Sequence, residues 1–233
     1  APNIETTPGW KETLYWMHDN TPNDAQMFNW WDEGHWVSFI GERKVITDNR
    51  NLDGQANAAY ARFVLSTNEE DAYTLTIDPE KIIQSGRKDF GPYNSDYVIF
   101  SDDLLSKTSS MTYYAYNTIN PNDPRLQGYF GAGLPCSPLG GVSSSQSYSC
   151  GGNNLTAAQL NSLPTTWTNV ANQLIAENTP GFVYRNPDNS KIYIFNQKTN
   201  STFGAKLWLN DPAIRHFKEV FHSGEVKVYK VVP

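Results

Sequence analysis

The sequence predicts an α+β fold, with a helical N-terminal half followed by a mostly antiparallel β C-terminal part. Before residue 178, apolar residues recur mainly at helical spacing, as in residues 53–66. After Gly181, short runs alternate apolar and polar side chains between Asn, Pro and Gly, a pattern typical of strands. We expect one globular domain over residues 1–233, with a mainly helical core over 1–178 and a β-rich portion over 179–233, since 233 residues can bury a sizeable core.

Helix signals mark several segments of the first half. Residues 5–17 are expected to form a helix entered through Thr7-Pro8, because Pro is tolerated in a first helical turn. Residues 53–66 predict a second helix. Asn68 opens a third, because acidic residues fill its first turn, where the helix dipole favours them. Ser101 is expected to start a fourth helix that continues into Tyr116.

The other segments are assigned from turn residues and alternation. Residues 28–40 are aromatic-rich and broken at Gly34, residues 127–152 are expected to be a Gly/Ser-rich loop, and Thr156 is expected to cap a helix. Residues 167–177 and 214–221 are also predicted to be helical. The predicted strands cover residues 43–47, 97–100, 182–186, 191–197, 205–209 and 225–231.

Charge and hydropathy limit the classes of partner. The net charge is -6 and no Lys/Arg run is longer than a pair, so we expect no nucleic-acid partner. No apolar stretch approaches the roughly 20 residues that span a bilayer, so we expect this polypeptide to be soluble. Aromatic residues make up 13% of the chain, including seven Trp, which suits cores, interfaces and carbohydrate or peptide clefts alike.

Two cysteines, Cys136 and Cys150, bracket a loop rich in Gly, Ser and Pro. A disulfide between them would close a 15-residue loop and stabilise the fold by about 3 kcal/mol in the chain-entropy model. Two free thiols are the alternative. We predict the disulfide, which indicates an oxidising compartment outside the cytoplasm.

The most unusual segment is Trp30-Trp31-Asp32-Glu33-Gly34. Adjacent Trp residues cannot share one face of a helix or strand, and the Asp and Gly that follow favour an exposed bend. An indole N–H only donates a hydrogen bond, whereas an ionised carboxylate only accepts one. A ligand that satisfies both must donate and accept together, as a hydroxyl does. Ordinary core Trp residues with Asp32 as a helix cap are the structural alternative.

With its flanks, this pentapeptide resembles the WWDxG signature of the oligosaccharyltransferase catalytic subunit, whose usual form has Tyr where this chain has Glu33. The resemblance extends to archaeal members through ETLYWMHDNTP, NWWDEGHWV, GERKVITDN, RFVLSTNEEDA and FKEVFHSGEVKVYKV. It covers most of the chain and is weakest over residues 77–94 and through the cysteine loop. It implies the C-terminal soluble domain of such a subunit.

The resemblance also implies a role for each residue of the motif. In the family, WWD holds the hydroxyl of Ser or Thr at position +2 of an Asn-X-Ser/Thr acceptor site, which makes Trp30 and Trp31 the donors and Asp32 the acceptor. A helix with Asp, Lys and Met or Ile completes the family's pocket. Here DDLLSKTSSM is similar, and it supplies Asp103, Lys107 and Met111 at i, i+4 and i+8.

Four assignments in and around this pocket are less direct. The spacing from Asp103 to Lys107 is one residue longer than the common eukaryotic form, which puts Asp103 in doubt, and an exposed ion pair beside a core Met is the alternative. Glu33, Gly34 and His35 are possible supporting residues. For His35, a packing role is the simpler alternative.

The resemblance implies partners and a location as well. The complete protein would carry an N-terminal multi-span membrane portion, absent from this chain, that binds a divalent Mn²⁺ or Mg²⁺ ion and a dolichol-type lipid-linked oligosaccharide. The acceptor polypeptide would bind the domain on the extracytoplasmic face of the cell membrane. We therefore expect the chain alone to be inactive, with no catalytic residue and no metal ligand of its own.

Other classes of protein fit parts of the sequence. A secreted carbohydrate-binding module or a glycoside hydrolase would also use exposed Trp or paired carboxylates, and a surface-layer domain would fit the cysteine loop. The four His residues are dispersed, without metal-ligand spacing. Two Asn-X-Thr motifs, at Asn154 and Asn200, are possible glycosylation sites, although motifs this short recur by chance.

Overall fold

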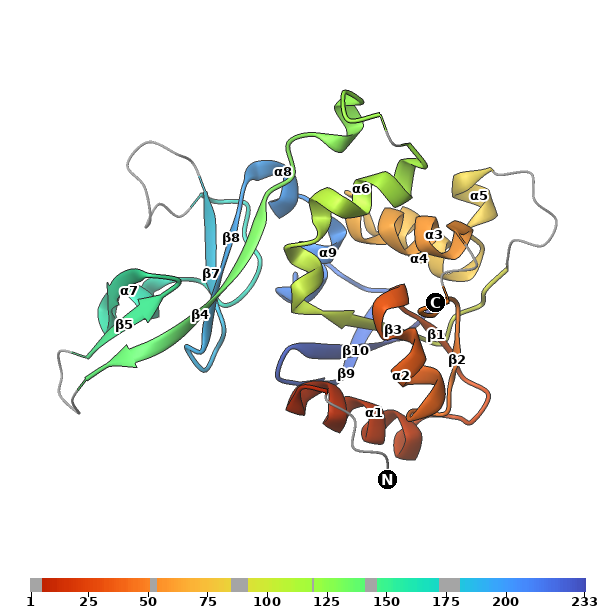
Figure 1. Ribbon diagram of the computed structural model, residues 1–233, viewed down its shortest axis with the longest axis horizontal. Helices are drawn as coiled ribbons and strands as arrows, with labels where there is room; N and C mark the ends of the chain where they lie inside the picture. The colour runs from red at the N-terminus through yellow and green to blue at the C-terminus, as the bar shows by residue number, and fades with distance from the viewer. Residues whose placement is uncertain (1–5, 51–53, 85–91, 119, 141–145, 172–180) are drawn as a thin grey trace.

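The computed structural model describes residues 6–50, 54–84, 92–118, 120–140, 146–171 and 181–233. They form a main body, in which helices cover both faces of a sheet, and a smaller β lobe that projects from it (Figure 1). No helix within these ranges is long and apolar enough to cross a membrane.

The sheet of the main body joins strands from both ends of the chain. Its order is β2-β1-β3-β10-β9; β1 pairs in parallel with β2 and β3, while β10 pairs antiparallel with β3 and β9. The bounds are β1 Gln26–Phe28, β2 Lys44–Val45, β3 Tyr97–Ser101, β9 Phe217–Ser223 and β10 Val226–Val231. The sheet is therefore mixed, and its antiparallel part is C-terminal, as predicted.

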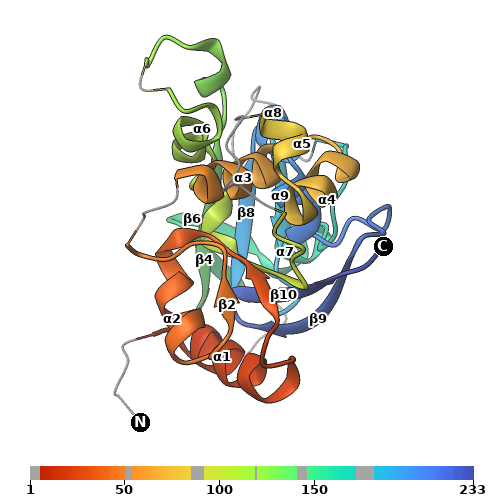
Figure 2. The same ribbon diagram turned by 90° about the vertical axis from the view of Figure 1, so that its right-hand side faces the viewer.

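Helices enclose this sheet in two layers (Figures 1 and 2). On one face lie α1 and α2; on the other lie α3, α4, α6 and α9, with α5 and α8 at the periphery. The helix bounds are α1 Pro8–Asn20, α2 Gly34–Phe39, α3 Gly54–Leu65, α4 Glu69–Ile77, α5 Glu80–Ile83, α6 Thr108–Tyr116, α8 Gln197–Asn200 and α9 Phe203–Trp208.

The central strand β3 explains why both layers are needed. Tyr97 and Ile99 pack in the cluster with α1, whereas Val98 and Phe100 pack in the larger cluster with α3 and α9. Successive side chains of a strand point to opposite faces, so a strand covered on both sides is continuously apolar. All five residues of β3 are buried accordingly.

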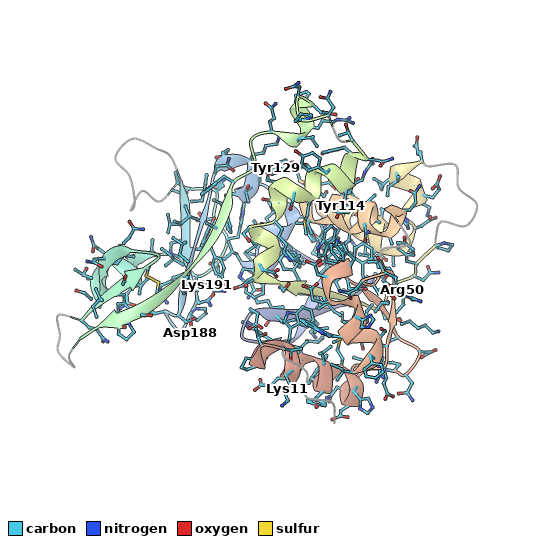
Figure 3. The ribbon with its side chains drawn as sticks, viewed as in Figure 1. Lys11, Arg50, Tyr114, Tyr129, Asp188 and Lys191 are labelled. Carbon is cyan, nitrogen blue, oxygen red and sulfur yellow. A yellow bond between two sulfur atoms is a disulfide. The ribbon has the colours of Figure 1, made fainter. Side chains whose placement is uncertain are left out.

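The projecting lobe is an antiparallel sheet of order β6-β5-β4-β8-β7 with the short helix α7 (Ala157–Ser162). Its strands are β4 Gly131–Leu139, β5 Ser147–Cys150, β6 Asn153–Thr156, β7 Phe182–Arg185 and β8 Lys191–Phe195. Lys191, labelled in Figure 3, forms an ion pair with the buried carboxylate of Asp102, and the Tyr193 hydroxyl donates to the same oxygen at 2.9 Å. These contacts join the lobe to the end of β3.

Several predicted elements are confirmed together with their capping residues. α1 begins at Pro8, and α3 covers residues 54–65 of the predicted helix. The Asn68 side chain accepts a hydrogen bond from the Asp71 N–H and caps α4. Thr156 and Gln159 form a capping box at the start of α7, in which each side chain bonds the other residue's backbone N–H.

Two predictions in the middle of the chain were wrong. The described residues within 127–152 (127–140 and 146–152) lie mostly in strands rather than in a loop, because β4 and β5 pair with each other and β4 with β8. A Cβ at Gly131 would lie 2.2 Å from the Leu105 carbonyl oxygen, so this glycine permits a close contact between β4 and the main body. Residues 167–171 are not helical, and residues 172–177 lie outside the described residues.

Two C-terminal predictions were wrong, because a predicted strand is a helix and most of a predicted helix is a strand. Residues 205–209 belong mostly to helix α9, whose N-cap is Thr202, whereas 217–221 lie in strand β9 instead of a helix. Short apolar runs carry too few positions to separate the two periodicities. After β9, the turn at Gly224 (φ 53°) returns the chain into β10. The pairing of β9 with β10 makes residues 217–221 a strand.

The fourth predicted helix is also corrected, because residues 101–116 form two segments. A 3₁₀ helix, η2, covers Asp102–Leu105, and α6 begins at Thr108 with Lys107 as its N-cap. Asp103, Lys107 and Met111 therefore do not form one stripe of a single helix. The break directs Asp102 toward the lobe and leaves Asp103 beside Lys107.

The structure contains the predicted Cys136–Cys150 disulfide, which links directly paired residues of β4 and β5. We expect the double variant Cys136→Ala/Cys150→Ala to lose about 3 kcal/mol of unfolding free energy, because the unfolded chain loses its cross-link. Chemical denaturation with and without reductant measures this loss. A wild-type protein whose stability does not respond to reductant would contradict the expectation.

Candidate functional site

The Trp30–Gly34 motif lies where β1 leaves the sheet. Trp30 follows the strand in extended conformation, Trp31–Glu33 form a 3₁₀ turn (η1), and α2 begins at Gly34. In this turn Trp30 and Glu33 are buried, whereas Trp31 and Asp32 are partly exposed. The predicted bend is therefore present, in the form of a 3₁₀ turn.

Two asparagines that sequence reasoning missed fix this turn. The buried Asn29 Nδ2 donates to the carbonyls of Trp30 (2.8 Å) and Thr47 (2.9 Å). Asn49 Nδ2 donates to the Asp32 carbonyl at 2.7 Å, and its Oδ1 accepts from the His35 N–H at 3.2 Å. The signal for both was their position directly beside the motif and within the segment RKVITDN.

Gly34 allows the loop after β2 to pack closely against the motif. Its φ of -56° is ordinary for a helix, so the bend does not need glycine for conformational reasons. A Cβ here would lie 2.1 Å from the Thr47 carbonyl oxygen and 2.7 Å from the Asp48 Cα. Glycine is therefore required by the approach of the loop after β2.

The carboxylate of Asp32 contacts Lys107. Lys107 Nζ lies 2.6 Å from Asp32 Oδ2 and 2.7 Å from Asp103 Oδ2. Within the described part of the chain, Asp32 Oδ1 receives no hydrogen bond, and the Asp32 side chain keeps 27% of its surface exposed. One carboxylate oxygen thus orients the group while the other stays available.

The two indoles differ in their surroundings. Trp30 is a core residue that packs edge-on against Tyr114 at 5.2 Å between ring centroids and tilted against Tyr60 at 5.9 Å. Tyr114 lies on α6 and is labelled in Figure 3. Trp31 is only partly buried, yet its Nε1 is covered and has no hydrogen-bond acceptor among the described residues. Trp31 therefore carries a donor that the described residues leave unused.

Glu33 points inward and is 8% exposed. Burial is the main cause that raises the pKa of Glu33 to about 8. The nearby negative charges of Asp103 and Asp32 contribute to this rise in pKa, whereas the positive charge of Lys107 opposes it. Its carboxyl group is therefore mostly protonated at neutral pH, and it adds no full negative charge beside Asp32.

Two predicted residues lie apart from the exposed carboxylate. Met111 is fully buried in the main core, so it presents no surface to a ligand in this structure. His35 is exposed at the start of α2, where its backbone N–H, not its ring, bonds to Asn49. The structure thus brings together Asp32, Glu33, Asp103 and Lys107, with Trp31 next in the chain.

This arrangement suits a hydroxyl group better than a metal ion. The free Asp32 oxygen accepts a hydrogen bond, and an indole N–H donates one. The Lys107 ammonium already occupies the space between Asp32 and Asp103, where a cation would otherwise bind. Among the described residues, no group of three or more His, Cys, Asp or Glu side chains is placed to hold a metal.

We expect Glu33 to make stability depend on pH. Below pH 4.5 its carboxyl is protonated in both the folded and the unfolded chain. Between pH 4.5 and about 8 only the unfolded chain releases this proton, so the unfolding free energy falls as pH rises. The total is on the order of 5 kcal/mol, at 1.36 kcal/mol per pH unit.

The variant Glu33→Gln should remove this contribution, because an amide does not titrate. Denaturation measured from pH 4 to 9 should show the wild type losing stability relative to the variant across that range. Parallel pH profiles for the two proteins would show that Glu33 titrates normally in the folded state.

Sequence comparison finds relatives in one functional class. No protein-family model matches the chain. It is 36% identical over 66 residues to the rice (Oryza sativa) dolichyl-diphosphooligosaccharide–protein glycosyltransferase subunit STT3B, covering 28% of this chain and 9% of that protein. It is 25% identical over 157 residues to dolichyl-phosphooligosaccharide-protein glycotransferase 2 of Archaeoglobus fulgidus, covering 55% of this chain and 26% of that protein. The matched part thus spans 9% of one relative's length and 26% of the other's.

Solved structures share the whole fold. The PglB C-terminal domain of C. jejuni superposes with a TM-score of 0.58 at 14% identity, covering 95% of this chain and 99% of that one. The C-terminal globular domain of an Archaeoglobus fulgidus oligosaccharyltransferase gives 0.52 at 16% identity, covering 98% and 100%. By its sequence this chain is homologous to the STT3 and AglB oligosaccharyltransferase subunits, and its fold is that of their C-terminal globular domains.

Proposed function

We propose that this domain binds acceptor polypeptides at Asn-X-Ser/Thr and holds the hydroxyl of the Ser or Thr at position +2. In the complete protein, an oligosaccharide would then pass from a lipid carrier to the Asn side chain, in the reaction of protein N-glycosylation. The homology to oligosaccharyltransferase subunits supports the reaction class.

This proposal rests on the carboxylate of Asp32, of which, within the described part of the chain, one oxygen is hydrogen-bonded and the other is not. Its Oδ2 is fixed by Lys107 at 2.6 Å, whereas its Oδ1 receives no hydrogen bond from the described residues. The acceptor hydroxyl would donate to Oδ1, and its lone pairs would accept from the unused Trp31 Nε1. Because that nitrogen is covered, a small shift of the surrounding side chains must accompany binding.

Trp30, Lys107 and Met111 support the hydroxyl site in different ways. Lys107 orients Asp32 and neutralises part of the local charge. Trp30 and Met111 form the packed wall behind the motif, where they fix the position of Trp31 and α6. In the proposed complex, a Thr methyl group reaches Met111 only after the side chains that cover it move.

The proposed contribution to catalysis is positioning. By binding the acceptor two residues after its Asn, the domain would hold the Asn amide near the sugar's reactive carbon. The two reacting groups would then be held in a fixed geometry and would not have to meet by diffusion. The Mn²⁺ or Mg²⁺ ion and the lipid-linked oligosaccharide would bind in a membrane portion outside this chain, on the extracytoplasmic side. The domain alone would then transfer no sugar, and it would bind free glycans poorly, unlike a lectin or a glycoside hydrolase.

The variant Asp32→Ala should lower kcat/KM for a synthetic acceptor peptide by about a hundredfold in the full-length enzyme, since it removes a charge-assisted hydrogen bond. Asp103 still pairs with Lys107, so folding should be retained. The matched control is Asp24→Ala, which removes an exposed carboxylate from the turn before β1. Transfer at the wild-type rate by Asp32→Ala would refute the role of this carboxylate.

The variant Trp31→Phe keeps an aromatic ring but lacks the N–H donor. We expect the acceptor KM to rise about tenfold, the value of one hydrogen bond to a ligand, with an unchanged unfolding temperature. The control is Trp36→Phe in α2, whose ring packs against Trp10 at 5.8 Å instead of facing the site. Equal KM values for both variants would assign Trp31 a packing role only.

A further inference from the structure

The chain itself contains two acceptor motifs, Asn154-Leu155-Thr156 and Asn200-Ser201-Thr202. A folded protein accommodates a glycan on such a motif only where the Asn side chain reaches its surface. The two asparagines differ sharply in this respect, so the fold itself separates them.

Asn200 cannot carry a glycan in the folded protein. It is 1% exposed, its Oδ1 accepts from the Tyr184 hydroxyl at 2.6 Å, and its Nδ2 donates to the Thr168 carbonyl at 3.0 Å. Thr202 is equally buried and caps α9 through a hydrogen bond from the Ala205 N–H. A sugar on the Asn200 amide nitrogen would displace the segment around Thr168 from the core.

Asn154 has the opposite environment. It lies in β6, which is the edge strand of the lobe's sheet and follows the turn at Gly151-Gly152. Leu155 packs in the lobe core, so the exposed Asn154 and Thr156 point to the other face of the strand. Its side-chain amide makes no hydrogen bond to any described residue, and a glycan there would meet no protein atom of the core.

We propose that Asn154 is an N-glycosylation site of this chain and that it is modified before α7 folds. The inference rests on the proposed function in one respect, namely that the domain lies on the extracytoplasmic side. The reaction forms a bond between the Asn154 amide nitrogen and the anomeric carbon of a lipid-linked oligosaccharide. The bond from that carbon to the lipid phosphate breaks, the phosphate leaves with the bonding electrons, and the amide proton passes to solvent.

The order of events follows from the Thr156 hydroxyl. In the folded chain its Oγ1 accepts from the Gln159 N–H at 3.2 Å and lies 3.1 Å from Gln159 Oε1, to which it donates. Both hydrogen-bonding functions of this hydroxyl are therefore used in the capping box. An enzyme that must hold the +2 hydroxyl can engage Thr156 only while the capping box is open, that is, before α7 forms or when it unfolds.

A glycan at this position would also protect the lobe. An edge strand presents unpaired backbone groups that can pair with another chain. Asn154 lies in the middle of β6, so a bulky hydrophilic group there shields this edge from pairing. The charged side chains that commonly protect an edge are absent from the four residues of β6.

The test is glycopeptide mass spectrometry on the full-length protein isolated from its native membranes. We expect the peptide that contains Asn154 to carry a glycan and the peptide that contains Asn200 to carry none. Asn154→Gln should abolish the modification, whereas Thr156→Ser, which keeps both the acceptor motif and the capping hydroxyl, should preserve it. An unmodified Asn154 in membranes that glycosylate a synthetic acceptor peptide would overturn the inference.

The timing is tested by blocking the synthesis of the lipid-linked donor while the protein is made and restoring it after folding. Asn154 should then stay unmodified, while chains made after restoration are modified. Equal occupancy in both pools would show that folded α7 is no barrier. The proposed function is tested separately, because it is judged from Asp32→Ala acting on a synthetic peptide and does not depend on Asn154.

Discussion

The ammonium group of Lys107, which lies 75 residues after Asp32 in the chain, connects the 3₁₀ turn of the motif with the 3₁₀ turn that follows β3. Burial lowers the pKa of Lys107, but its hydrogen bonds to Asp103 and Asp32 outweigh that effect and raise it, so the group stays charged. One positive charge between two carboxylates leaves excess negative charge, which helps to keep the adjacent Glu33 protonated. The orientation of Asp32 and its free oxygen depend on this ion pair, whereas Glu33 stays protonated mainly because it is buried.

The sheet determines where these two turns meet. β1 and β3 are parallel neighbours, so their carboxyl ends lie at the same edge, and the chain leaves both strands there. From that edge, η1 carries Asp32, while η2 carries Asp102 and Asp103. Asp102 binds the lobe through Lys191 and Tyr193, whereas Asp103 binds Lys107, so two consecutive carboxylates anchor the lobe and the candidate site independently.

The sequence predicted the parts of the molecule that local chemistry determines. Capping residues such as Asn68 and Thr156 identified their helices, and the Asp and Gly of the motif predicted its bend. The role of Asp32 as a hydrogen-bond acceptor for a ligand stays a prediction. The sequence did not predict features that depend on distant partners. The strands β4 and β9 form because other strands pair with them, and the burial of Met111 depends on how α6 lies against the core.

The placement of β10 affects how the protein can be made. Residues 226–231 insert between β3 and β9, with Val226 opposite Ser101. A ribosome must therefore translate the chain from Ser101 to Val226 and beyond before β3, from which η2 emerges, obtains its second neighbour. Until then the nascent polypeptide exposes one side of an apolar strand, a state that is prone to misassembly. Truncations or fusions near residue 231 would accordingly disturb the candidate site, part of which is encoded near residue 30.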